Sequence, residues 1–194
     1  MAVDTESLLD AIDGIAYLAD PKGMIVAVGA TAWNQFAEDN GAPHLTKPDG
    51  VIGRRLRDFV HGDDVVAFYD RCLSALRRGD RRSVSFAFRC DAPRFRRELH
   101  MTISPLIRGG EVRGFLHQSQ LVDERQRPPI NLFDMAALQR HLAADRNLPF
   151  VRICSFCHDV KETRDGEAHE WQSAEEYYRR GGTGQVQLSH GICP

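Results

Sequence analysis

The chain has 194 residues, and its hydrophobic share of 42% and charged share of 27% are those of an ordinary globular protein, built as one domain with an appendage or as two small domains. The formal net charge of −2 gives no general reason to expect binding to nucleic acid or to a membrane. Because no apolar run approaches about 18 residues and the acidic start lacks a signal-peptide pattern, we expect a cytoplasmic protein with reduced thiols and no membrane-spanning helix.

The first part of the chain is expected to form a helix, a β-hairpin and a group of helices. Residues 4–12 carry apolar side chains at helical spacing. Two short strands, over 15–19 and 24–28, flank the turn sequence Asp20-Pro21-Lys22-Gly23. Helical patterns then follow over 33–40, near 51–56 and from His61-Gly62-Asp63-Asp64 to Gly79.

Three strands are expected after these helices. Apolar and polar residues alternate over 84–88, 99–103 and 112–121, and Gly109-Gly110 makes the turn before the last stretch. Alternation with a period of two indicates strands with one buried face, which is typical of an antiparallel sheet. The sequence therefore predicts an α+β domain in the order β-β-α-α-α-β-β-β.

The composition changes after the last of these strands. Residues 123–129 are charged and proline-bearing, which favours a linker, and residues 134–144 have one apolar helical face. Further on, Ser173-Ala174-Glu175-Glu176 is a capping box that opens a short helix. We therefore divide the chain into a domain over 1–122, a linker and helix over 123–149, and a Cys/His module over 150–194.

That last module carries two pairs of metal-ligand residues. Cys154 and Cys157 form a C-x-x-C string, and His190 and Cys193 form H-x-x-C. Such ligands at this spacing are those of a tetrahedral Zn²⁺, and a closed set of four favours a structural site. The tail contains many polar residues, so we expect that it cannot form a hydrophobic core of its own. We therefore predict a zinc-ribbon or knuckle-like module in which the metal ion holds the two ligand pairs together.

Other interpretations of these residues stay open. His158 is an alternative fourth ligand, and the cysteines could instead be free thiols on a flexible tail. The string from Cys154 to His158 also matches the c-type haem attachment pattern, which needs maturation outside the cytoplasm.

The chain resembles a PAS domain over residues 5–122. The element order and length are similar, and His61-Gly62-Asp63-Asp64 resembles the H-P-D-D start of the long helix in many PAS domains, with Gly62 where proline is usual. The resemblance implies a five-stranded antiparallel sheet with short helices packed on one face. It also implies a sensory module of signal transduction, in which flanking helices often make a homodimer.

A more particular resemblance is to a bacterial subgroup of PAS-like proteins. The shared strings are Arg89-Cys90-Asp91-Ala92-Pro93, Met101-Thr102-Ile103-Ser104-Pro105-Leu106, Arg127-Pro128-Pro129, Cys154-Ser155-Phe156-Cys157, Trp171 and Ser189-His190-Gly191-Ile192-Cys193-Pro194. The subgroup usually has lysine at the position of His158, and its string continues to a further cysteine beyond the position of Pro194. This difference makes His190 the predicted replacement ligand.

PAS cores often hold haem, flavin or a small metabolite between the sheet and the helices. The resemblance thus implies a pocket near Trp33, Phe36, Phe115 and His117. Haem would need an axial ligand, for which His61, His100 and His117 are candidates. We expect His100 to face water and His117 to share a strand face with Phe115. Cys72 and Cys90 lack the context of a flavin photoreceptor and are expected to be structural.

The chain shows no G-x-S-x-G, P-loop, glycine-rich dinucleotide turn or H-E-x-x-H string, so we predict no enzymatic activity. We expect a PAS-type sensory or protein-interaction module with a structural zinc site. It would form a homodimer through the N-terminal helix or the sheet and act on an unidentified signalling protein. The alternatives are a thiol redox switch through Cys154 and Cys157, and a haem-binding sensor. The arginines near the strand ends are expected to form a solvated rim rather than a nucleic-acid surface.

Overall fold

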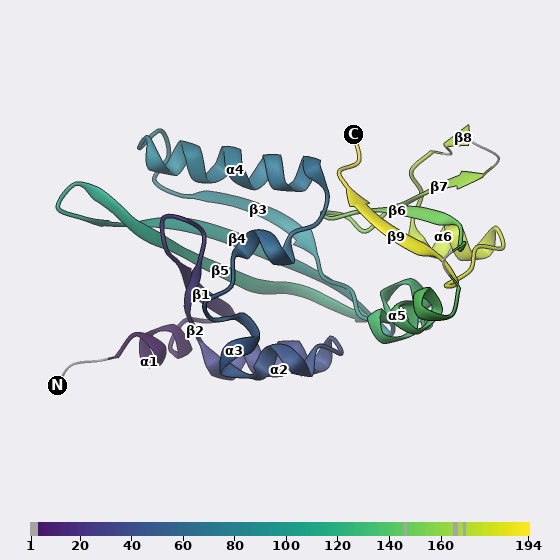
Figure 1. The fold of residues 1–194 in the computed structure, drawn as a ribbon, viewed down its shortest axis with the longest axis horizontal. Helices are drawn as coiled ribbons and strands as arrows, with labels where there is room; N and C mark the ends of the chain where they lie inside the picture. The colour runs from purple at the N-terminus through teal and green to yellow at the C-terminus, as the bar shows by residue number, and fades with distance from the viewer. Residues whose placement is uncertain (1–3, 146, 165–166, 169) are drawn as a thin grey trace. The chain divides into compact units, whose positions relative to one another are not determined.

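The alternating stretches of the sequence form one antiparallel sheet with the strand order β2-β1-β5-β4-β3 (Figure 1). Its strands are β1 Ile15–Ala19, β2 Ile25–Val28, β3 Val84–Arg89, β4 Phe95–Arg108 and β5 Glu111–Gln126. Strand β1 pairs antiparallel with both β2 and β5. This computed structural model describes residues 4–145, 147–164, 167–168 and 170–194.

The helices predicted for the first part of the chain are present. They are α1 Thr5–Asp10, α2 Ala30–Asp39, the 3₁₀ segment η1 Pro43–Thr46, α3 Pro48–Val51, the 3₁₀ segment η2 Leu56–Phe59 and α4 Asp63–Arg77. Helical side chains pack with strand side chains in a core of Tyr17, Ile25, Val28 and Val51, bordered by Trp33, Leu56 and Phe59. The sheet and its helices confirm the predicted α+β, PAS-like fold.

Strands β4 and β5 are longer than the sequence predicts. Their alternation marks only the part with a buried face, where Leu99, Met101 and Ile103 are buried and His100 is exposed. At the end of the hairpin away from its turn, both strands continue with charged side chains. There Arg97 Nε and Glu124 Oε2 form an ion pair at 2.5 Å. Backbone pairing does not need apolar side chains, so β5 runs into the segment predicted to be a linker and ends at Gln126.

The chain divides into two compact units. The first holds the chain up to Val60, Val66–Ala87 and Leu99–Val122, and the second holds His61–Val65, Phe88–Glu98 and Asp123–Pro194. The division into 1–122, 123–149 and 150–194 made from the sequence stays a prediction. No helix in the described part of the chain is long and apolar enough to cross a membrane.

The second unit has its own sheet, ordered β8-β7-β6-β9 (Figure 1). Its elements are η3 Asn131–Phe133, α5 Met135–Ala144, β6 Phe150–Cys154, β7 Val160–Arg164, β8 Glu167–Ala168, α6 Ala174–Arg179 and β9 Gln187–Gly191. Helix α6 begins as predicted, because the Ser173 side chain accepts a hydrogen bond from the Glu176 N–H at 3.1 Å. Strands β6 and β9 pair in parallel, whereas β6 and β7 are antiparallel.

The expectation that the tail is too polar to make a core is wrong. Tail residues form a buried cluster together with four residues of the preceding segment. The cluster consists of Ile130, Leu132, Phe133, Leu138, Val151, Ile153, Val160, Ala174, Tyr177 and Val186. The core residues of the tail itself, such as Val151, Val160 and Tyr177, come from segments that lie far apart in the sequence. Pairing of distant strands gathers them on one face of the small sheet.

Candidate metal site

The C-x-x-C string forms a tight turn between β6 and β7. The His158 N–H donates to the Cys154 carbonyl at 3.0 Å, and the Cys154 N–H donates to the Asp159 carbonyl at 2.8 Å. His158 adopts a positive φ of 56°, which closes the turn. The distant Cys193 comes close because Gly191 is the register partner of Cys154 in the parallel β6–β9 pair.

Three sulfur atoms gather at this turn. The Sγ atoms of Cys154, Cys157 and Cys193 lie within 4.8 Å of one another, and those of Cys157 and Cys193 are 3.5 Å apart. Two sulfurs about 2.3 Å from one Zn²⁺ at a tetrahedral angle would be roughly 3.8 Å apart. The sulfur spacing and the soft donor set therefore fit a single tetrahedral zinc ion.

The surroundings of the sulfurs shift the pKa values of Cys154 and Cys157 in opposite directions. Burial acts to raise the pKa of Cys154, but N–H groups directed at its sulfur lower the pKa below its ordinary value. Two of these donors are the N–H groups of Phe156 at 3.4 Å and Cys193 at 3.5 Å. Burial, together with the neighbouring thiols, raises the pKa of Cys157 instead. A bound metal ion would have to displace the proton from that thiol.

The three-sulfur group does not include His190. This residue lies within β9 as the register partner of Ile153, whereas Gly191 is the partner of Cys154. Successive strand residues point to opposite faces, so His190 and Cys154 belong to different faces of the pair. The His190 ring lies 5.8 Å from the His61 ring. The role of His190 as fourth ligand stays a prediction.

The alternative ligand His158 faces a different neighbour. Its ring stacks on Phe133 with 5.2 Å between ring centroids. Its Nδ1 lies 3.7 Å from Asp91 Oδ1, which is too long for a hydrogen bond. In this arrangement His158 contacts a buried carboxylate behind the turn.

Arg89 and Asp91, from the motif Arg89-Cys90-Asp91-Ala92-Pro93, hold this turn from behind. The Arg89 N–H donates to the Phe156 carbonyl at 2.7 Å, and Arg89 Nη1 donates to the Cys157 carbonyl at 2.6 Å. The Arg89 guanidinium also pairs with the fully buried Asp91 carboxylate. Burial acts to raise the pKa of Asp91, but the facing His158 and Arg89 lower it more, so the carboxylate stays ionised.

Arg127, from the motif Arg127-Pro128-Pro129, completes this buried cluster. Its Nη1 lies 2.9 Å from Asp91 Oδ2 and 3.0 Å from Glu175 Oε1. Sequence reasoning quoted both motifs as shared strings but assigned no role to Arg89, Asp91 or Arg127. A local pattern cannot connect these residues to a turn that begins 27 positions after Arg127 and more than sixty positions after Asp91, and the arginine–aspartate spacing was the only available signal.

A conformational constraint explains the glycine in His61-Gly62-Asp63-Asp64. Gly62 has a φ of 93°, which proline cannot adopt. A Cβ atom at this position would lie 2.7 Å from the His190 carbonyl oxygen. The close approach of this segment to β9 therefore needs glycine where PAS domains usually have proline.

Two of the four predicted pocket residues, Trp33 and His117, contact Tyr17. Trp33 packs edge-on against Tyr17, with ring centroids 5.9 Å apart, and its Nε1 donates to the Leu45 carbonyl at 3.0 Å. The His117 ring stacks on Tyr17 with centroids 4.5 Å apart. Phe115 and His117 are both fully buried, as their shared strand face predicts, whereas Phe36 is half-buried.

His117 is unusual among these core residues. Neither of its ring nitrogens has a hydrogen-bond partner in the described part of the chain. Burial lowers the pKa of His117 to about 4, so the ring is neutral at physiological pH. A buried imidazole whose nitrogens have no hydrogen-bond partner can serve as the axial ligand of a haem iron held in the core.

No protein-family model and no curated protein matches the chain. Solved structures resemble it at low identity. The PAS domain of BvgS from Bordetella pertussis is 18% identical, with 72% of this chain and 91% of that chain covered and a TM-score of 0.46. A sensory box sensor histidine kinase from Vibrio cholerae is 12% identical, with 59% and 86% covered and a TM-score of 0.41.

The PAS domain of an HTR-like protein from Haloarcula marismortui is 16% identical, with 60% of this chain and 88% of that chain covered and a TM-score of 0.38. All three TM-scores lie below 0.5, so the fold assignment rests on the element order and the sheet itself. By these two criteria the sheet of five strands and its helices form a PAS-like fold.

Proposed function

We propose that this protein is a PAS-type sensory or protein-interaction module that carries a structural zinc ion on Cys154, Cys157, Cys193 and His190. The observation that carries the metal part is the group of three sulfurs within 4.8 Å of one another. The buried cluster behind the turn adds support, since it fixes the carbonyls of the C-x-x-C string without using the sulfurs. A zinc ion would tie the β6–β7 turn to the segment that follows β9.

Metal analysis of the purified full chain tests this proposal. We expect about one zinc per chain, with loss of zinc in the Cys157→Ser and Cys193→Ser variants and full retention in Cys72→Ala, which removes a cysteine distant in sequence from this group. Comparison of His190→Ala with His158→Ala identifies the fourth ligand, because only the ligand variant should hold zinc more weakly. A folded, metal-free wild-type protein would overturn the proposal.

A thiol redox switch is the second candidate, favoured by the 3.5 Å contact between Cys157 Sγ and Cys193 Sγ. Hydrogen peroxide would oxidise two thiols to a disulfide and be reduced to two molecules of water, with release of the metal. The sequence points to Cys154 and Cys157 as the pair, whereas the contact favours Cys157 and Cys193. Peptide mapping after peroxide treatment tells the two pairs apart, and zinc that remains bound throughout argues against the switch.

A haem-binding sensor is favoured only by the unpartnered nitrogens of the buried His117. Tyr17 covers one face of that ring, so a haem iron would have to approach a ring nitrogen at the edge. An absorption spectrum of the protein after incubation with haemin tests this candidate. A Soret band that is lost in His117→Ala is expected, and the absence of any such band removes it.

The homodimer is proposed to form through the N-terminal helix. Leu8 of α1 is 59% exposed although its neighbour Leu9 is buried, so the helix presents an apolar side chain to solvent. Light scattering of the wild type and of Leu8→Glu tests this interface. A dimer that becomes a monomer in the variant is expected, and a monomeric wild type contradicts the proposal.

A further inference from the structure

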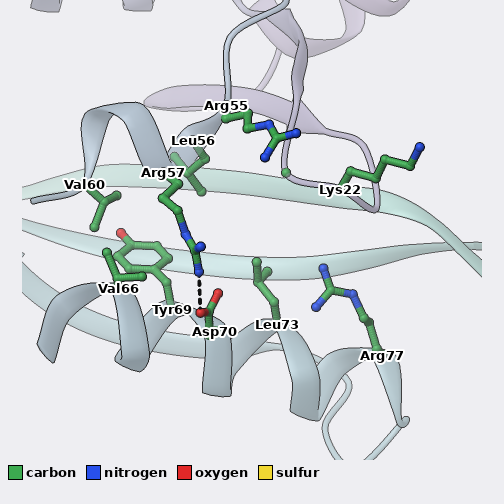
Figure 2. Close-up of a pocket in the computed structure, with 11 residues that line it drawn as sticks. Lys22, Arg55, Leu56, Arg57, Val60, Val66, Tyr69, Asp70, Leu73 and Arg77 are labelled. Carbon is green, nitrogen blue, oxygen red and sulfur yellow. Dashed lines mark hydrogen bonds and ion pairs between the residues drawn. The ribbon is translucent and has the colours of Figure 1, made fainter. Parts of the chain in front are cut away.

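The first unit contains a pocket of about 250 Å³ that no part of the proposed zinc function uses (Figure 2). Its lining residues are Lys22, Gly23, Arg55, Leu56, Arg57, Val60, Val66, Tyr69, Asp70, Leu73 and Arg77. Figure 2 shows that Arg55 and Arg57 reach it from one side and that Tyr69, Leu73 and Arg77 reach it from α4. The volume is slightly below the usual range for ligand pockets, about 300–1,000 Å³, so a ligand would have to be small.

Local backbone structure fixes the wall of the pocket that lies opposite α4. In the β1–β2 turn, Asp20 Oδ1 accepts hydrogen bonds from the N–H groups of Lys22 at 2.8 Å and Met24 at 2.9 Å. The segment before η2 adds to this turn, since the Leu56 N–H donates to the Gly23 carbonyl at 2.8 Å. These bonds place Lys22 and Arg55 on neighbouring pieces of backbone, opposite α4.

The lining is strongly cationic. It contains four basic side chains, Lys22, Arg55, Arg57 and Arg77, and one acidic side chain, Asp70. Arg57 Nη2 is paired with Asp70 Oδ2 at 2.6 Å, and Arg77 Nη2 donates to the Pro21 carbonyl at 2.8 Å. Among the described residues, neither Lys22 nor Arg55 forms an ion pair, and Arg55 takes part in the cap of η2, where its backbone N–H donates to Asp58 Oδ2 at 3.2 Å. The pocket therefore keeps a net charge of three positive units, from four cations and one anion.

The rest of the lining is apolar. Leu73 is buried, and Leu56, Val60, Val66 and Tyr69 are half-buried beside it. Burial raises the pKa of Tyr69 to about 12, so it presents a neutral ring and hydroxyl to the pocket. An inorganic anion would leave these surfaces without a partner, whereas an organic anion would cover them.

We propose that this pocket binds a small organic anion. Its carboxylate or phosphate group would lie among Lys22, Arg55 and Arg77, and its apolar body would pack on Leu56, Leu73 and the Tyr69 ring. Lys22 and Arg55 form no ion pair within the described part of the protein. They can therefore pair with a ligand anion without breaking an existing ion pair. This inference rests on the sensory part of the proposed function and is independent of the metal.

Calorimetric titration at low salt, with two anions and one neutral analogue, tests the ligand class. The probes are phenyl phosphate, benzoate and benzamide, with inorganic phosphate as a fourth. We expect saturable binding of one or both aromatic anions, at least tenfold tighter than benzamide or inorganic phosphate. Equal binding of inorganic phosphate and phenyl phosphate would overturn the organic class. The absence of saturable binding by both aromatic anions would overturn the site.

Variants test the location. Lys22→Gln/Arg55→Gln removes two exposed cations that make no ion pair among the described residues, so the fold should be preserved. We expect it to weaken binding by at least tenfold, whereas Arg81→Gln, a change of one exposed cation outside the pocket, should leave binding within twofold. Unchanged binding in the double variant contradicts the assignment. Zinc content measured on the same samples should be equal in all, so failure of the pocket is distinguishable from failure of the metal proposal.

Discussion

Asp91 carries a buried carboxylate between two arginines and a histidine. The side chains of Arg89 and Arg127 are 10% and 8% exposed, and that of Asp91 is fully buried. Removing one member of a buried ion cluster leaves the others as uncompensated charges, which costs more than the cluster contributes as a whole.

Asp91→Asn should therefore lower the free energy of unfolding by about 3–5 kcal/mol. Asp80→Asn is the matched control, because Asp80 pairs with Arg78 on the surface and such a pair contributes about 0–1 kcal/mol. Urea unfolding of both variants measures the difference. A loss in Asp91→Asn no larger than in the control would show that the arginines find water or other partners.

His117 makes the stability of the first unit depend on pH. Its pKa is about 4 in the folded chain, because burial disfavours the charged ring, against about 6.5 when unfolded. The unfolded state then binds a proton that the folded state excludes. The stability associated with the neutral ring is fully present above the unfolded pKa and is lost as the pH falls toward 4.

Between pH 7 and pH 5 this one residue should lower the free energy of unfolding by about 2 kcal/mol. The His117→Phe variant should lack that part of the pH dependence, while the exposed His100→Gln should retain it. Urea unfolding at the two pH values gives the comparison, and protonation of the cysteine site affects all three proteins alike. Parallel pH profiles for wild type and His117→Phe would contradict the assignment.

At the scale of elements, the start of α4 and the end of β9 constrain each other through backbone alone. Gly62 combines a positive φ with a close approach to the His190 carbonyl. Other positive-φ glycines, such as Gly79 after α4, have no atom near the position of an added Cβ.

Gly62→Ala should destabilise the chain by more than Gly79→Ala, which carries only the left-handed strain of about 1–2 kcal/mol. We expect an additional loss of about 1–3 kcal/mol in Gly62→Ala, since a backbone carbonyl cannot move without shifting β9. Thermal or urea unfolding of the two variants measures this difference. Equal losses would show that β9 adapts freely.

Elements with local signals were predictable. The capping box at Ser173, the hairpin over 15–28 and the alternation over 99–103 each depend on neighbours in sequence, and each is present. The extension of β5 to Gln126 was not predictable, because its outer part has no apolar face and is held by pairing with β4. The strand that contains His190 was also not predicted, because β9 is held in place by pairing with the distant strand β6 and not by a local pattern of residues.

At the scale of the whole molecule, each unit has a core of its own. The second unit's buried cluster includes residues of β6, β7, η3 and α6 and does not include any of the three cysteines. A structural zinc at the turn would then add to an existing core rather than replace it, unlike the small zinc fingers that are unfolded without metal.

Removal of the metal by a chelator should thus loosen the site and leave the unit folded. We expect faster amide hydrogen exchange over residues 154–158 and 190–193, with protection retained at Val151 and Ile153. Hydrogen exchange with mass spectrometry on the full chain, with and without chelator, measures this. Loss of protection throughout β6 and α6 would mean that the metal is required for the fold.

The sequence by itself determined the periodicity of the first sheet, the capped helices and the C-x-x-C turn, because each is encoded within a few residues. Only the tertiary structure decided which distant groups meet. It brought Cys193 to Cys154 and Cys157 through the β6–β9 register, paired His190 with Ile153 in that register, and joined Arg89, Asp91 and Arg127 behind the turn. These outcomes depend on pairing between segments far apart in the chain, and no local pattern of residues carries that information.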